Sequence, residues 1–221
     1  MKKIVLVLFG VLFLTVANAQ IRWGVKAGGN LSKITDKLDG DKIDGAKARL
    51  GFHLGGMMEY SFNPSFALQP ELLFSVNGGK TEFEGILDIP GMGDVDFKGD
   101  EISTIYQIQI PVNLKYVMGT DDMKFFVTAG PYFGIGLSAK GKLKGLANYK
   151  DLTSIGIEQT GVNLCDNRVK RFDFGIGARI GIEIKKIMIG AGYQFGITNL
   201  SDIDKTSSRL GTFQLSVGYF F

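Results

Sequence analysis

The stretch from residue 171 to residue 184, RFDFGIGARIGIEI, alternates between two kinds of side chain. Apolar residues occupy every second position from Phe172 to Ile184, and charged residues or glycine occupy the positions between them. Successive side chains of a strand point to opposite faces, whereas a helix would spread this pattern around its axis. The stretch therefore predicts one long two-faced strand, more than twice the usual five or six residues.

Seven other segments alternate in the same way, which makes eight strands in all. They cover residues 21–32, 49–62, 66–78, 101–117, 124–138, 187–198 and 210–221. The connections alternate between short ones, at 63–65, 118–122 and 185–186, and long ones, near 33–48, 79–100, 139–170 and 199–209. Short turns at one end and long loops at the other are typical of an outer-membrane barrel. We expect an all-β fold: an eight-stranded antiparallel up-and-down transmembrane β-barrel.

The composition of the two faces indicates which one meets lipid. One face is bulky and apolar, and the other mixes glycine with polar and charged residues of both signs. In a transmembrane barrel the apolar face points outward and the polar face lines the lumen. A soluble periplasmic barrel that binds a small ligand would invert this arrangement, and we keep it as an alternative. Aromatic residues near the strand ends, such as Trp23 and Tyr219, fit a girdle at the periplasmic interface.

An eight-stranded barrel leaves a lumen that side chains just fill, so charges inside it must pair. We predict a plugged lumen with an ion-pair network among Arg22, Glu59, Lys115, Glu183, Glu71 and Arg179. Lumen glycines, among them Gly190 and Gly192, would make room for these long side chains. Phe220 also faces inward in this register. Pro70, Pro111 and Pro131 predict bulges or local breaks, because proline cannot donate to a strand ladder.

The first residues, MKKIVLVLFGVLFLTVANAQ, predict a signal peptide with cleavage after Ala19. Two lysines precede an apolar run that is too short for a membrane anchor, and an A-x-A site follows it. We therefore expect a signal peptide at 1–19 and one barrel domain at 20–221. Without Lys2 and Lys3 the chain has 23 basic and 22 acidic residues, a balance that gives no reason to expect nucleic acid as a partner.

The chain also resembles a known family, the PorT-like outer-membrane β-barrel proteins. The segments that carry the resemblance are GVKAGGNLS, LQPELLFSVNGGK, IQIPVNLKY, FFVTAGPYFGIGLSAK, FDFGIGARIGIEI, AGYQFGITNLSD and LSVGYFF. They occur in the family's order across nearly the whole mature chain. The resemblance implies an eight-stranded barrel in the outer membrane of a Gram-negative bacterium. It brings no catalytic motif, and we do not transfer the secretion role of one member.

His53 is the only histidine and faces the lumen in the predicted register. It supports an alternative function, an outer-membrane lipid-modifying hydrolase with His53 as the base. The acidic cluster Asp36, Asp39, Asp41 and Asp44 lacks the spacing of a calcium loop. Lone Cys165 has no internal partner for a disulfide. We expect no catalytic, cofactor-binding or metal residue.

The sequence favours a non-enzymatic structural or interaction protein whose long loops, chiefly 139–170, meet a partner or the exterior. Its other expected partners are the outer-membrane lipid bilayer and the barrel insertion machinery. The segment TFQLSVGYFF, residues 212–221, is predicted to pair with the first strand and to present a terminal aromatic residue to that machinery. A diffusion pore fits less well, because the predicted lumen is full.

Overall fold

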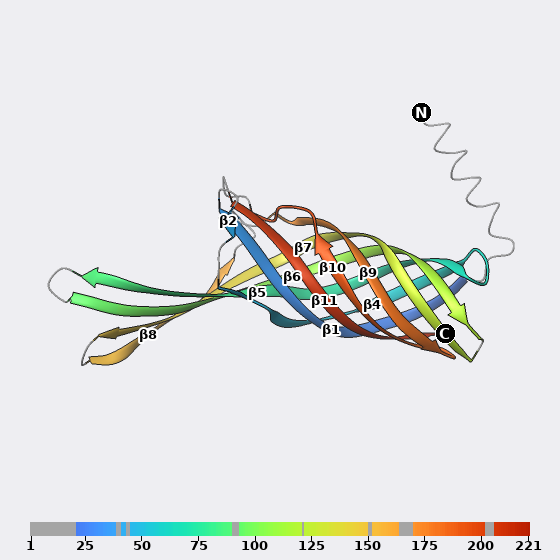
Figure 1. The fold of residues 1–221 in the computed structure, drawn as a ribbon, viewed down its shortest axis with the longest axis horizontal. Coiled ribbons are helices and arrows are strands. Elements are labelled where there is room, and N and C mark those ends of the chain that lie inside the picture. Colours follow the sequence, from blue (N-terminus) through green and yellow to red (C-terminus); the bar gives the residue numbers. More distant parts are fainter. Residues whose placement is uncertain are drawn as a thin grey trace, which may run out of the picture.

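The computed structural model describes residues 21–38, 41–42, 45–89, 93–120, 122–149, 152–163, 170–201 and 206–221. Strands make up most of this part of the chain (Figure 1). They are β1 (Ile21–Leu38), β2 (Asp41–Lys42), β3 (Ala46–Lys47), β4 (Arg49–Ser61), β5 (Phe66–Ile89), β6 (Gly93–Gly119), β7 (Met123–Tyr149), β8 (Leu152–Asn163), β9 (Phe172–Ile184), β10 (Ile187–Gly196) and β11 (Thr206–Phe220). No described residue belongs to a helix long and apolar enough to cross a membrane.

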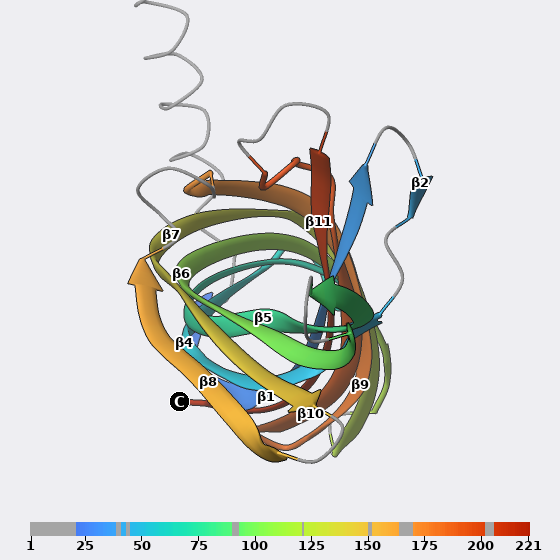
Figure 2. The ribbon, with the colours of Figure 1, turned by 90° about the vertical axis from the view of Figure 1, so that its left-hand side faces the viewer.

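Eight of these strands form a closed antiparallel ring, as predicted (Figure 2). Their order is β1, β4, β5, β6, β7, β9, β10 and β11, and β11 pairs back onto β1. This closing pair runs from Gly24 opposite Phe220 to Leu38 opposite Thr206, so the last predicted strand does complete the barrel. Closure leaves the ring without a free edge, which a lipid environment requires. Strands β2, β3 and β8 lie outside the ring and pair with β1, β5 and β7.

Two of the four predicted long loops are instead largely strand. β5 and β6 continue as a hairpin from the barrel rim to the pair Ile89–Gly93, and β7 continues to Tyr149 before β8 folds back on it. In Figure 1 these hairpins project from the barrel at the end opposite the C-terminus. The prediction of loops at 79–100 and 139–170 was wrong because it ended each strand where the apolar alternation ends. Main-chain hydrogen bonds hold a hairpin together without a buried apolar face.

The three prolines inside strands each coincide with a lapse in the pairing. Pairing of β4 with β5 lapses opposite Pro70, that of β5 with β6 beside Pro111, and that of β6 with β7 opposite Pro131. The register is the same on both sides of each lapse, so these are the local breaks that the sequence predicted. Within the ring, the described register shift lies elsewhere, between Tyr106 and Gln107 of β6.

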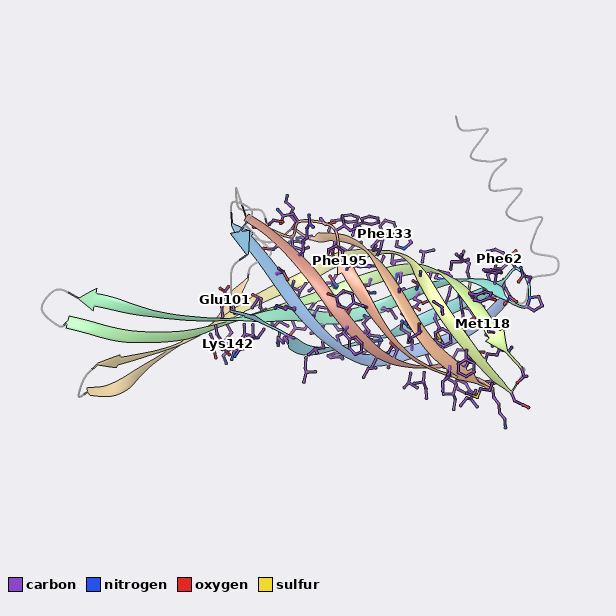
Figure 3. All side chains as sticks on the ribbon, in the orientation of Figure 1. Phe62, Glu101, Met118, Phe133, Lys142 and Phe195 are labelled. Atoms are coloured by element: carbon purple, nitrogen blue, oxygen red, sulfur yellow. The ribbon has the colours of Figure 1, made fainter. Side chains whose placement is uncertain are left out.

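The outward face of the ring is apolar, as predicted. Among the exposed side chains, Trp23 is 61% exposed, Ile180 63% and Leu215 58%. Figure 3 shows such side chains, including Phe133, Phe195 and Met118, around the barrel. The predicted aromatic girdle faces outward at the end with the short turns, where Phe66 packs on Tyr116 with ring centroids 5.0 Å apart. A water-facing barrel would place these groups inside, so the soluble alternative is wrong.

Candidate functional site in the barrel lumen

Four charged side chains from four different strands meet in the lumen near the periplasmic end. We call this group, Arg22, Glu59, Lys115 and Glu183, the ionic box. Lys115 Nζ donates to Glu59 Oε2 at 2.6 Å and to Glu183 Oε2 at 2.8 Å. Arg22 pairs with Glu59 and donates from Nη1 to Glu183 Oε1 at 2.6 Å. Two cations and two carboxylates balance, which meets the requirement that buried charges pair.

Aromatic rings support the two cations of the ionic box from the lumen side. The Arg22 guanidinium lies 4.3 Å from the centroid of the Phe220 ring, and Lys115 Nζ lies 4.9 Å from that of Phe126. Both rings belong to a buried apolar cluster with Met57 and Met188. Phe220 is 1% exposed, which confirms its predicted inward orientation. Cation–π contact adds to the ion pairs where the charge is shielded from water.

A second charged group lies deeper, beyond this apolar cluster. In this group, the lumen triad, Glu71 pairs with Lys26 and accepts from Arg179 Nη1 at 2.9 Å. The ideal Cβ position of Gly192 lies 2.9 Å from Arg179 Cβ and that of Gly190 lies 3.0 Å from Arg179 Cδ. A side chain at either glycine would crowd the arginine, so the predicted role of these glycines is confirmed.

The predicted pairing is therefore confirmed for all six charged residues, with one difference in arrangement. The pairs fall into two groups that share no member among the described residues, and Lys26 joins the second group. The sequence places Lys26 on the lumen face but does not show which carboxylate it meets. That choice depends on the stagger between strands, which brings β1 residue 26 to the level of β5 residue 71.

His53 lies above the lumen triad in a buried hydrogen-bond chain. Its Nδ1 is 2.7 Å from Asn30 Oδ1, and its Nε2 is 3.0 Å from Ser216 Oγ. The three side chains are 1–2% exposed. A Cβ at Gly28 would lie 2.6 Å from His53 Cε1 and would collide with the main-chain oxygen of Leu215. His53 is therefore closely packed against Gly28, and both of its ring nitrogens have a hydrogen-bond partner.

The lumen is closed on both sides of these groups. A buried apolar cluster of Ile105, Ala139, Leu200 and Leu210 fills its extracellular end, with Ile34 packed against it. A small cavity, about the size of one water molecule, lies beside Thr128, Arg179 and Gln194, which carry buried polar atoms without a protein partner. A recess of about 570 Å³ opens to the periplasmic side and ends at Arg22 and Glu59. The described side chains therefore plug the lumen, as predicted.

Beyond the extracellular end of the apolar band, a smaller charge cluster ties β3, β5 and β6 together. Glu82 pairs with Lys47 and accepts from Lys80 at 2.9 Å, and Lys80 lies 3.0 Å from Asp100. The hydrogen bonds from Lys47 and then Lys80 hold the pKa of Glu82 at about 2. The hydrogen bonds that Lys80 donates to Glu82 and Asp100 raise the pKa of Lys80. Lys47 is exposed and the other three side chains are half-buried near the solvent, so these pairs fix the hairpin base more than they stabilise the barrel.

The structure does not describe two further features that the sequence pointed out, the lone cysteine and the side chains of the acidic cluster. Cys165 is outside the described residues, as are the side chains of the acidic cluster at 36–44. Among the described side chains, no three His, Cys, Asp or Glu residues gather closely enough to hold a metal ion.

The closed ring, its apolar outer face and its charge-filled lumen define an integral β-barrel protein of the Gram-negative outer membrane.

Comparison with known proteins agrees with this class. The family model described as "Outer membrane protein beta-barrel domain" matches residues 17–202, and the chain belongs to that family. No curated protein sequence matches the chain.

Three solved structures are among those that match the chain. The attachment invasion locus protein Ail of Yersinia pestis, in complex with a heparin analogue, is 18% identical (91% of this chain, 99% of that chain, TM-score 0.37). Neisserial surface protein A is 15% identical (90% and 97%, TM-score 0.40). OprG of Pseudomonas aeruginosa is 14% identical (92% and 95%, TM-score 0.43).

Proposed function

We propose that this protein is a non-conducting, non-enzymatic outer-membrane barrel that presents its extracellular hairpins to a protein partner. The observation that carries the proposal is the pairing of buried charges across the lumen. Lys115 reaches carboxylates on two other strands, and it is 0% exposed. A lumen filled in this way has no room for a solute. The projecting strands of β5, β6, β7 and β8 are then the part of the chain placed to meet the exterior.

Two measurements test the two halves of this proposal. The purified protein in planar lipid bilayers should give no discrete single-channel steps, and regular unitary steps from the wild type would overturn the plugged lumen. A photo-crosslinking amino acid at Glu101, which is exposed at the base of the hairpins (Figure 3), should give a distinct adduct in cells. The same amino acid at Asn63, in a periplasmic turn, is the control. Equal adduct patterns, or none from Glu101, would contradict the interaction role.

We further propose the finer assignments that the sequence suggested. The ordered segments from GVKAGGNLS to LSVGYFF support a place among the PorT-like barrels. The charged, apolar and A-x-A regions of residues 1–19 support a cleaved leader, and N-terminal sequencing of the membrane-inserted protein should begin at Gln20. The outward Tyr219 and Phe221 support recognition of the last strand by the insertion machinery.

A hydrolase is the second candidate, because the order Ser216–His53–Asn30 matches a nucleophile, a base and an orienting group. Burial argues against it, since Ser216 is 2% exposed inside the barrel and lipid lies outside. A fluorophosphonate probe should therefore fail to label Ser216, and His53→Ala should leave the lipid A composition of the membrane unchanged. Stoichiometric labelling that disappears in Ser216→Ala would establish the enzyme instead.

A further inference from the structure

Two cations stand side by side on the outer face of the barrel, across the seam between β1 and β11. Lys33 pairs in register with Gly211, and Thr35 pairs with Arg209, so the two cations are diagonal neighbours on the same face. Both side chains are exposed, and neither forms an ion pair within the described residues. Adjacent like charges on a sheet destabilise it unless something neutralises them.

A tyrosine hydroxyl, held over a glycine, lies beside these two cations. Gly211 has no side chain, and a Cβ at this position would collide with the hydroxyl of Tyr193. Tyr193 belongs to β10 and is 52% exposed on the outer face. The ammonium of Lys33, the guanidinium of Arg209 and this hydroxyl can all donate hydrogen bonds to an anion. Phe195 pairs in register with Gly211, so its label in Figure 3 shows where Gly211 lies on the barrel.

The height of this group matches the outer boundary of the membrane. Lys33 is ten residues beyond Trp23 of the periplasmic girdle, and Arg209 is ten residues from Tyr219. Ten residues rise about 34 Å along a strand and about 26 Å along the membrane normal at a tilt of about 40°. The apolar band of such barrels is about 25 Å tall. The cations therefore lie where outer-leaflet headgroups begin, directly above the exposed apolar residues Leu31 and Phe213.

From this geometry we infer that Lys33, Arg209 and Tyr193 form a binding site for the phosphate group of an outer-leaflet lipid. Lys33 and Arg209 supply the charge, and the Tyr193 hydroxyl, held over Gly211, supplies a neutral donor. The lipid's acyl chains lie along the apolar face below. A soluble phosphate would gain only the polar half of this site. The proposal depends on the membrane assignment but not on the plugged lumen or on a protein partner.

The test compares lipid binding by three forms of the full barrel in detergent micelles, using native mass spectrometry. The probes are diphosphorylated lipid A, dephosphorylated lipid A and inorganic phosphate. The double variant Lys33→Gln/Arg209→Gln should bind diphosphorylated lipid A roughly 30-fold more weakly, since each surface cation contributes roughly fivefold. The matched control Lys185→Asn/Lys186→Gln removes two exposed cations from the periplasmic turn and should bind as the wild type does.

Each outcome decides the matter. Equal binding by the double variant and the wild type would overturn the site, as would equal binding of the dephosphorylated lipid by the wild type. Inorganic phosphate should not displace the lipid at equal concentration, and displacement would show that the site takes a free anion instead. Tyr193→Phe keeps both charges and should weaken binding severalfold, which gives a second reading if the double variant assembles poorly. Loss of binding in the periplasmic control would refute the location.

Discussion

Removing Lys115 should destabilise the barrel more than removing any exposed lysine. Its Nζ lies 2.6 Å from one Glu59 oxygen and 2.8 Å from one Glu183 oxygen, and the side chain is 0% exposed. Lys115→Met leaves two buried carboxylates with only Arg22 to neutralise them. Breaking a buried ion pair in this way costs about 3–5 kcal/mol. We expect the free energy of unfolding to fall by that amount.

The assay uses urea unfolding of the refolded barrel in lipid vesicles, followed by the fluorescence of Trp23. This residue is the only tryptophan of the chain and lies 61% exposed on the lipid face, so its emission reports loss of the membrane environment. Lys186→Met, at an exposed turn, is the control and should change the free energy by less than about 0.5 kcal/mol.

A compensating variant separates lost charge balance from lost packing. In Lys115→Met/Glu59→Gln the charges of the ionic box balance again, because Arg22 then faces only the carboxylate of Glu183. This double variant should recover at least about 2 kcal/mol of the loss, because replacing a whole buried pair is far milder than removing half of it. The reasoning is refuted if Lys115→Met stays within about 1 kcal/mol of the wild type, or if the double variant is no more stable than the single one.

Three further outcomes follow from other parts of the structure. Deleting Tyr219–Phe221 removes part of the closing pair and should abolish the heat-dependent gel shift of the folded barrel; a normally shifting truncation would count against closure at this seam. Gly28→Ala should cost about 1–3 kcal/mol through its collision with the main chain, whereas the neighbouring Gly29→Ala, which meets nothing within 4 Å, should be nearly neutral in the same urea assay. The carboxyl of Glu82 should titrate near pH 2 by NMR and closer to its ordinary pKa of 4.5 in Lys47→Ala; because its folded pKa is the lower one, its contribution to stability is complete above pH 4.5 and is lost as the pH falls toward 2.

The sequence predicted the ring and its two faces because both follow from alternation, which is a local property. A strand that alternates from Phe172 to Ile184 must present one apolar face whatever its neighbours are. The inward position of Phe220 follows in the same way, because it alternates with the outward-facing Tyr219 and Phe221. The members of the ionic box could also be named, because they share the lumen face and lie near the short turns.

What alternation could not predict is how far each strand continues and which lumen groups meet. The hairpins of β5 with β6 and of β7 with β8 persist through main-chain pairing, which composition does not reveal. The contact of Lys26 with Glu71, and the chain from Asn30 through His53 to Ser216, depend on the stagger around the ring. The site beside Gly211 was missed for a similar reason, since Lys33 and Arg209 come together only when β11 closes on β1.

The seam between β1 and β11 has a consequence for the order of events during biogenesis. The two strands that close the ring are the first and last ones in it, and their paired residues lie up to 196 positions apart, from Gly24 to Phe220. Contacts between such distant residues form slowly, because the loop between them must first be ordered. Until β11 pairs with β1, the edge of β1 remains unpaired and the barrel does not yet enclose the charged side chains of the lumen. A chain that lacks β11 therefore cannot close its ring, and we expect pairing of β1 with β11 to be the last step of barrel assembly.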